Sequence, residues 1–332
     1  MSKKLKVTLI VCISLVLLGL IFCGAARVMG FSGSFGITMD MKYVDFTKGN
    51  NNAHLEKTAI APFTDIEALG LVGDTRFVPS DGYYIEYNFD GPVNISYGVE
   101  NGVLRLNAAY SGGKNELFLL YMEQGPSLLS MGRLSDKGNI TVYYPEGSNF
   151  NSVNIENSFG DMKISGLSCS ELNITASAGD IELAGIAAVI SLVQNEFGEI
   201  DVHGLSGDSA EFILSAGDLS LENVTENISL KVQNHFGDVD IAAVSAGNIS
   251  ITNNNGDVAM TGFSAQKVDI TDDFGDIDLK KPENPEGTSF DLLTDFGDIE
   301  VFGRDYGSRA IIEKADGPSV TARNNCGDIT VK

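Results

Sequence analysis

The chain has 332 residues, of which 45 are acidic and 22 basic, and its net charge is −23 at pH 7. This charge argues against nucleic-acid binding, which needs clustered Lys and Arg, and against docking on anionic lipid headgroups. Hydrophobic residues make up 43% of the chain, enough for a large core, and 37 glycines indicate an architecture rich in turns.

An almost wholly apolar segment, Val7 to Ala26, follows three lysines near the N-terminus. It is long enough to cross a bilayer as a helix, and the positive-inside rule places everything after it outside the cell membrane. The pattern predicts a single-pass signal anchor over residues 1–27. Two alternatives remain open: a cleaved signal peptide with a small-residue site at Gly24-Ala25-Ala26, and a lipoprotein modified at Cys23.

Residues 28–56 are polar and lack a sustained period, which predicts a flexible tether. Residues 57–150 contain irregular strand-like runs and a hairpin signal at Asn101-Gly102. They also contain a Gly73-Asp74 pair that looks like a divergent copy of the later repeat. We expect this region to supply a cap and the first coils of a solenoid, because an open end exposes unpaired strand edges. An insertion at 111–138 contains the apolar run Leu117 to Met122, either a hairpin or loop packed on the cap or an exposed partner site.

A tandem repeat fills residues 151–332. Nine glycines, each followed by an acid, mark its register: Gly160, Gly179, Gly198, Gly217, Gly237, Gly256, Gly275, Gly297 and Gly327, with steps of 19, 19, 19, 20, 19, 19, 22 and 30 residues. A period near 20 residues with strand-like content predicts an all-β parallel solenoid of about nine coils. The usual hand of parallel β crossovers makes right-handed coils the expectation.

Apolar residues recur two and four positions after each glycine and five positions before it, as at Ile181, Leu183 and Val193. This alternation predicts a strand, a tight Gly-acid turn, a second strand and a loop back, with stacked copies burying continuous apolar columns. The chain ends at Lys332 directly after a coil, so we expect that last coil to be open or used in assembly.

Two further columns keep the same register. Asparagine stands three positions before the glycine at Asn157, Asn195, Asn234, Asn253 and Asn324. We expect these amides to point inward and to bond to each other or to turn backbone. Directly before the glycine, large and small residues alternate through the first five coils: Phe159, Ala178, Phe197, Ala216 and Phe236. We expect each ring to pack over a small neighbour inside the core.

The repeat also aligns its acids. One set follows the glycines: Asp161, Asp180, Glu199, Asp218, Asp238, Asp257, Asp276, Asp298 and Asp328; a second, outward set is Glu182, Asp201, Asp240, Asp278 and Glu300. Unit charges about 5 Å apart in water repel by about 0.8 kcal/mol, which hydrogen bonds or cations must offset. The main interpretation is that the turn acids bond nearby backbone N–H groups. Bound Ca²⁺ and a surface for cationic partners remain alternatives.

Other residues with catalytic or metal-binding chemistry form no motif. His54, His203 and His235 lack metal-ligand spacing, and the cysteines Cys12, Cys23, Cys169 and Cys326 form no CxxC. No P-loop, G-x-S-x-G or H-E-x-x-H motif is present. We therefore predict no catalytic, cofactor-binding or metal-binding residue, and no disulfide between Cys169 and Cys326, which several coils separate.

The repeats Phe159-Gly-Asp161, Ala178-Gly-Asp180, Phe236-Gly-Asp238 and Phe274-Gly-Asp276, preceded by the strand 140–145 and an anchor, resemble the bacterial putative-adhesin family. The resemblance covers residues 58–332 and implies a β-solenoid of unknown function in cell-envelope proteins, some associated with envelope stress. We predict a non-enzymatic adhesin or scaffold that binds an envelope or extracellular protein or glycan. The alternatives are a regulatory membrane protein of the envelope-stress response and a glycan-active β-helix enzyme.

Overall fold

The computed structural model describes residues 35–38, 43–45, 53–89, 93–110, 118–122, 138–280 and 282–332. The predicted anchor, most of the predicted tether and most of the insertion at 111–138 lie outside the described residues. Every regular element within the described part is a β-strand. This part of the chain accordingly holds no apolar helix of the length needed to cross a membrane.

The chain divides into two compact units. In the unit formed by residues 1–50 and 116–132, the structure describes an antiparallel sheet in which β1 (Phe35–Thr38) lies between β2 (Tyr43–Asp45) and β9 (Phe118–Met122). Residues 51–115 and 133–332 form the other unit. Its first strands are β3 (Ala53–Ala59), β4 (Asp65–Val72), β5 (Asp74–Ser80), β6 (Tyr84–Phe89), β7 (Val93–Glu100), β8 (Val103–Tyr110) and β10 (Gly138–Pro145).

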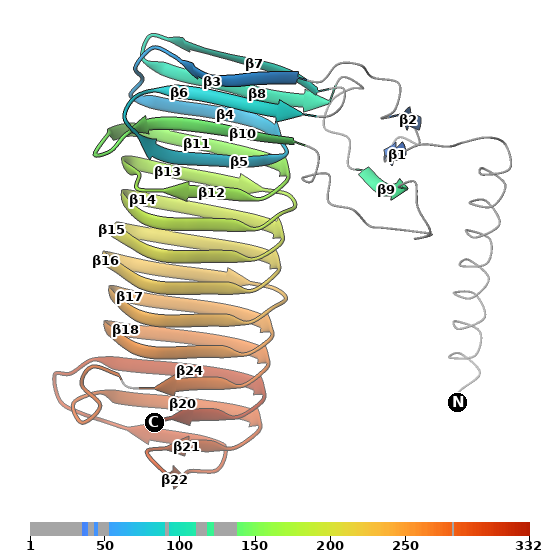
Figure 1. Ribbon diagram of the computed structural model, residues 1–332. Helices are drawn as coiled ribbons and strands as arrows, with labels where there is room; N and C mark the ends of the chain where they lie inside the picture. Colours follow the sequence, from blue (N-terminus) through green and yellow to red (C-terminus); the bar gives the residue numbers. More distant parts are fainter. Residues whose placement is uncertain are drawn as a thin grey trace, which may run out of the picture. The chain divides into compact units, whose positions relative to one another are not determined.

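The repeat region of this second unit is a stack of parallel strands (Figure 1). Its strands are β11 (Asn149–Phe159), β12 (Met162–Ser165), β13 (Ser168–Ala176), β14 (Ile181–Phe197), β15 (Ile200–Ala216), β16 (Leu219–Asn234), β17 (Val239–Asn255), β18 (Val258–Phe274) and β19 (Ile277–Lys280). Each copy pairs with the next at the repeat offset, so that Ile181 lies opposite Ile200. The predicted all-β parallel solenoid is therefore confirmed.

Each long strand makes a whole coil with three faces. In β14 the buried residues alternate along the strand, but two consecutive residues point outward at 184–185 and again at 189–190. These breaks in alternation are corners, so the predicted loop back is a continuation of the strand. The three predicted apolar columns are buried in every coil, and Ile181, Leu183 and Val193 are exposed by no more than 1%.

The Gly73-Asp74 pair is a true coil at the N-terminal end of the stack. Gly73 N–H donates to Phe159 O at 2.7 Å, and β4 and β5 lie parallel to β11 and β12. Beyond this coil the pairing becomes mixed, because β6 is antiparallel to both β3 and β10, and β7 is antiparallel to β8. The predicted hairpin turn joins β7 to β8, with Asn101 and Gly102 at φ of 52° and 80°. This turn geometry matches the twist of a hairpin.

The last coil of the sequence is not the last coil of the stack. The C-terminal strands are β20 (Ser289–Phe296), β21 (Ile299–Val301), β22 (Arg304–Asp305), β23 (Arg309–Ile312), β24 (Ser319–Cys326) and β25 (Ile329–Val331). Strand β24 pairs in parallel with β18 on one side and with β20 on the other (Figure 1). Strand β25 likewise pairs in parallel with β19 and with β21. The Gly327 coil is therefore inserted between the Gly275 and Gly297 coils.

This insertion overturns the expectation that the chain ends in an open coil at Lys332. The end of the stack belongs to the Gly297 coil, whose outer edge pairs with the antiparallel strands β22 and β23. The physical reason is that the coils share one register, so any coil can stack on any other. Strands β22 and β23 are antiparallel to the other strands of the stack, so they can pair only at its outer edge. The chain that follows them then forms the coil between the Gly275 and Gly297 coils.

The predicted packing of the phenylalanines inside the core is wrong for every ring except Phe159, which is half-buried and packs against the core. Phe197, Phe236 and Phe274 are each about 60% exposed, and Phe296 is 77% exposed. Strict alternation would point them inward, but the chain bends after the asparagine position, and the two residues before the glycine both face outward. The aliphatic columns fill the core without these rings.

Candidate functional site

The Gly-acid turns form one edge of the solenoid, which we call the turn edge. It comprises, in each coil, the two residues before the glycine, the glycine and the following acid. The turns stack so closely that a Cβ added to Gly237 would lie 2.2 Å from Gly217 O, and Gly237 has a φ of 131°. Only glycine meets both conditions, which is why the repeat keeps it.

The turn acids form a hydrogen-bonded ladder. The backbone N–H of an acid donates to Oδ1 of the aspartate in a neighbouring coil at 2.8–3.1 Å, as from Asp257 to Asp238 and from Asp276 to Asp257. A hydrogen bond to a charged group contributes about 1.5–3 kcal/mol, which exceeds the repulsion between neighbouring carboxylates in water. The interpretation that these acids bond nearby N–H groups is confirmed, with the donor in the next coil.

The outward acids behave differently from the turn acids. Some pair with side chains: Lys163 with Glu182, and Lys280 with Asp278 at 2.9 Å. His203 is an exposed surface residue, and its ring lies 3.1 Å from both Asp201 and Glu222. The charge of Asp201, with smaller effects from Glu222, raises the pKa of His203. The signal was present in the sequence, since Asp201 lies two residues before His203 and Glu222 lies one repeat after it.

The asparagine column lies inside the turns, as predicted, and binds turn backbone. Asn157 Nδ2 donates to Gly160 O at 2.9 Å and to Gly73 O at 3.2 Å, and Asn234 and Asn253 each donate to the glycine carbonyl of their own turn. Each amide thus satisfies a carbonyl that the tight turn would leave buried. This column holds the turn edge against the core.

Two acids, Asp272 and Glu226, are buried inside the stack. Asp272 occupies an asparagine position, with Asn253 and Asn324 beside it in the neighbouring coils, and it is fully buried. Burial raises its pKa to about 7, against smaller opposing effects of nearby amides. Glu226 lies in an inward column opposite Gly207 and Ala246, is 2% exposed, and burial likewise raises its pKa to about 7.

Asp272→Asn is expected to stabilise the chain above pH 7. Between about pH 4 and pH 7 the folded state binds a proton at Asp272 that the unfolded state has lost, so the free energy of unfolding falls as pH rises. The variant keeps the amide shape of the column and should be more stable than wild type by up to about 4 kcal/mol at pH 8. Urea unfolding at pH 4 and pH 8 checks this result.

The matched control for this prediction is Asp295→Asn, which changes an exposed acid two residues before a turn glycine. It should not alter the difference in stability between pH 4 and pH 8. Equal stabilisation by both variants at both pH values would contradict a role for burial.

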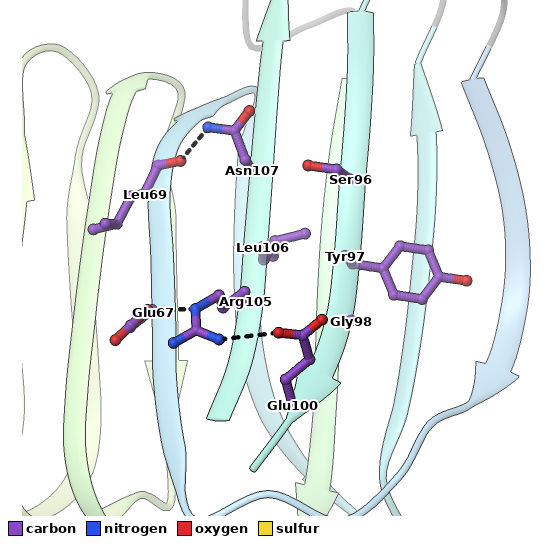
Figure 2. A pocket seen from close by; sticks show the side chains of 9 residues that line it. All are labelled: Glu67, Leu69, Ser96, Tyr97, Gly98, Glu100, Arg105, Leu106 and Asn107. Carbon is purple, nitrogen blue, oxygen red and sulfur yellow. Dashed lines mark hydrogen bonds and ion pairs between the residues drawn. The ribbon is translucent and has the colours of Figure 1, made fainter. Parts of the chain in front are cut away.

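A shallow groove of about 410 Å³ crosses β4, β7 and β8 in the cap (Figure 2). Its charged groups are paired: Arg105 Nε lies 2.9 Å from Glu67 Oε2, and Arg105 Nη1 lies 3.5 Å from Glu100 Oε2. Asn107 Nδ2 donates to Leu69 O at 2.7 Å. These pairs hold the strands together, and the groove brings together no nucleophile and base.

The described residues contain no cluster of three or more His, Cys, Asp or Glu side chains placed to hold a metal ion. Neighbouring turn acids instead contact each other's backbone through the ladder. The described cysteines are unbonded, with Cys169 buried and Cys326 exposed on the turn edge.

Comparison with known proteins gives one family match. A family model described as Toastrack DUF4097 matches residues 88–332, which is more than half of the chain. No curated protein matches the chain.

Solved structures of similar architecture share little sequence with this chain. A putative adhesin from Bacteroides fragilis NCTC 9343 is 14% identical over 86% of this chain and 98% of its own, with a TM-score of 0.43. A putative lipid binding protein from Parabacteroides distasonis ATCC 8503 is 13% identical over 86% and 98%, with a TM-score of 0.45. Because both TM-scores lie below 0.5, the names of these proteins carry no weight for this one.

Proposed function

The chain belongs to the Toastrack DUF4097 family, and on this premise we propose that it is a non-enzymatic binding protein. In this proposal its solenoid is a stiff acidic scaffold, anchored in a bacterial membrane, for an extracytoplasmic partner. The family match agrees with the resemblance expected from the Phe-Gly-Asp repeats. An adhesin role is the finer form of the same proposal.

The observation that carries the proposal is the turn edge. It presents one acid and two outward-facing side chains per coil at a regular spacing, on a backbone held by the acid ladder and the asparagine column. A surface so regular and rigid suits binding to an extended partner, because little conformational entropy is lost when its side chains are ordered.

A catalytic role has less support. Paired acids in an enzyme need environments that separate their pKa values around a substrate cleft. The turn acids of this chain instead have the same surroundings in coil after coil. The two acids whose pKa values are raised to about 7, Glu226 and Asp272, are buried inside the stack rather than facing a cleft. Partial desolvation and the charges of neighbouring turn acids also raise the pKa of Asp240, which is one of the exposed outward acids.

The anchor is supported by the apolar run from Val7 to Ala26 and the lysines before it. It predicts that Cys326, which is exposed, reacts with a membrane-impermeant maleimide when intact spheroplasts express the full chain. Cys169 should stay unlabelled, because it is buried and burial raises the pKa of its thiol to about 12. Mass spectrometry of the labelled peptides checks both expectations.

Cys326→Ser is the control and should remove the label. Labelling of Cys326 only after lysis would contradict extracytoplasmic display. Release of the chain from washed membranes would contradict a retained anchor and favour a cleaved signal peptide. Cleavage of envelope polysaccharide by the purified chain would contradict the non-enzymatic proposal.

A further inference from the structure

The phenylalanines of the turn edge form a regular file along the stack. We name Phe159, Phe197, Phe236, Phe274 and Phe296 the phenylalanine file. Phe159, at the N-terminal end of the file, is half-buried against the core, and the other four rings are exposed. In the order of the stack they are separated by Ala178, Ala216, Asn255 and Cys326, so that large and small residues alternate throughout. The sequence hides the C-terminal end of this regularity, because Phe296 precedes Cys326 along the chain and follows it in the stack.

We propose that the phenylalanine file and the adjoining turn acids bind a cationic polyproline II segment of a partner protein. This proposal rests on the binding role proposed above and names the surface and the partner chemistry. Its first support is exposure: Phe197, Phe236 and Phe274 leave about 60% of their surface in water, and Phe296 leaves 77%. Single exposed apolar residues are ordinary, but four exposed rings gathered along one edge are what an interaction surface requires.

The charge of the turn edge selects the partner. Each ring lies two residues before an acid in the same turn, as Phe236 does before Asp238 and Phe274 before Asp276. The ladder uses Oδ1 of these aspartates, and a carboxylate has about four lone-pair sites, so capacity for a cation remains. A second copy of the chain would bring like charges together, whereas lysine or arginine stems can lie across the rings and reach the acids.

The spacing of the rings selects the conformation of the partner. Successive rings are two strand spacings apart, about 9.6 Å. A polyproline II helix repeats every three residues, about 9.3 Å, so one side chain per turn meets each ring with little accumulated error. Two turns of an α-helix span about 10.8 Å, which exceeds the spacing of the rings by about 1 Å, and this mismatch accumulates at every ring. Proline-rich segments already bind aromatic surfaces in this conformation elsewhere.

The test measures binding of labelled peptides to the purified full-length chain by fluorescence anisotropy. The probe consists of about four Pro-Lys-Pro triplets. Its controls are a Gly-Lys-Gly peptide, which keeps the charge and loses the conformation, and a Pro-Gln-Pro peptide, which keeps the conformation and loses the charge. We expect each control to bind roughly tenfold more weakly than the probe, which corresponds to about 1.4 kcal/mol. Equal binding of either control would overturn the proposal.

The variant Phe197→Ser/Phe236→Ser/Phe274→Ser is expected to weaken binding of the probe roughly tenfold or more. The matched control is Ile190→Ser/Ile228→Ser/Ile311→Ser, which removes equally exposed apolar residues outside the turn edge and should leave affinity within about twofold. Thermal melting confirms that each variant is folded. Phe236→Ser alone, which changes the stack least, should give a partial loss.

Unchanged affinity of the triple phenylalanine variant would overturn the proposal. So would a wild-type dimer in sedimentation that this variant abolishes, because the file would then bind a second copy. Either result leaves the Cys326 labelling experiment unaffected, so failure of this inference is distinguishable from failure of the proposed function.

Discussion

Gly237→Ala is expected to destabilise the solenoid by roughly 2–6 kcal/mol, because it combines backbone strain with a steric clash. Gly237 has a φ of 131°, and its added Cβ would lie 2.2 Å from Gly217 O and 2.6 Å from the carbon of the same carbonyl. That carbonyl belongs to a turn backbone held by Asn234 and cannot move as a flexible side chain would. Thermal and urea unfolding followed by circular dichroism measures the loss.

Gly262→Ala is the matched control, since it changes another glycine of positive φ in the same stack. Its φ is 65°, and the nearest atom to an added Cβ is Ala243 N at 4.0 Å. Ala243 itself occupies the equivalent corner of the preceding coil with a φ of 53°. We expect a loss of about 1–2 kcal/mol from the left-handed conformation alone. Equal losses in the two variants would show that close stacking of the turns is not what requires glycine at position 237.

Deletion of residues 319–332 is expected to unfold the whole C-terminal end of the stack. The deletion removes β24 and β25, and with them the buried side chains of Val320, Ile329 and Val331. Each such side chain contributes about 1.5–3 kcal/mol when buried. Because these strands lie between two other coils, the Gly297 coil loses its parallel partners as well.

Limited proteolysis with mass spectrometry checks this prediction. The truncated chain should be trimmed back to about residue 280, whereas the full chain should be protected through its C-terminal coil. If the coils were stacked in sequence order, truncation would remove only an end coil, and the Gly297 coil would remain protected. A protected fragment that includes β20 and β21 would therefore contradict the inserted arrangement.

A cross-linking control tests the same arrangement without deleting any strand. Phe274→Cys should form a disulfide with Cys326 on mild oxidation, because the two positions are directly paired in β18 and β24. Asn255→Cys should not, because it lies one coil further away and about 9.6 Å exceeds the reach of a disulfide. A stack in sequence order would place position 274 equally out of reach.

The repeat made most of the fold predictable. Alternation over the residues around each glycine assigned Ile200, Leu219 and Val239 to the core, and their burial confirms it. The prediction for the phenylalanine file was wrong because alternation holds only while the strand is straight. At a corner two consecutive residues face outward, and the sequence marks the corner without showing on which residue it falls.

The acids of the candidate site could be predicted from the sequence, but the order of the coils that carry them could not. The nine turn acids could be read from spacing alone, and so could the hydrogen bonding that their type favours. The alternation of rings with small residues could be read from the sequence in the first coils, but its continuation past Phe274 could not, because it depends on Cys326 lying between Phe274 and Phe296.

The sequence by itself determined that this chain builds parallel coils of about 20 residues with a buried aliphatic interior and a file of acids, because period-2 burial is a local property of extended backbone. Only the tertiary structure decided which coil lies beside which. Coils of one register offer the same pairing surface to any neighbour, so local sequence leaves their order open. The order of the last coils follows from the antiparallel strands β22 and β23, which can pair only at the outer edge of the stack.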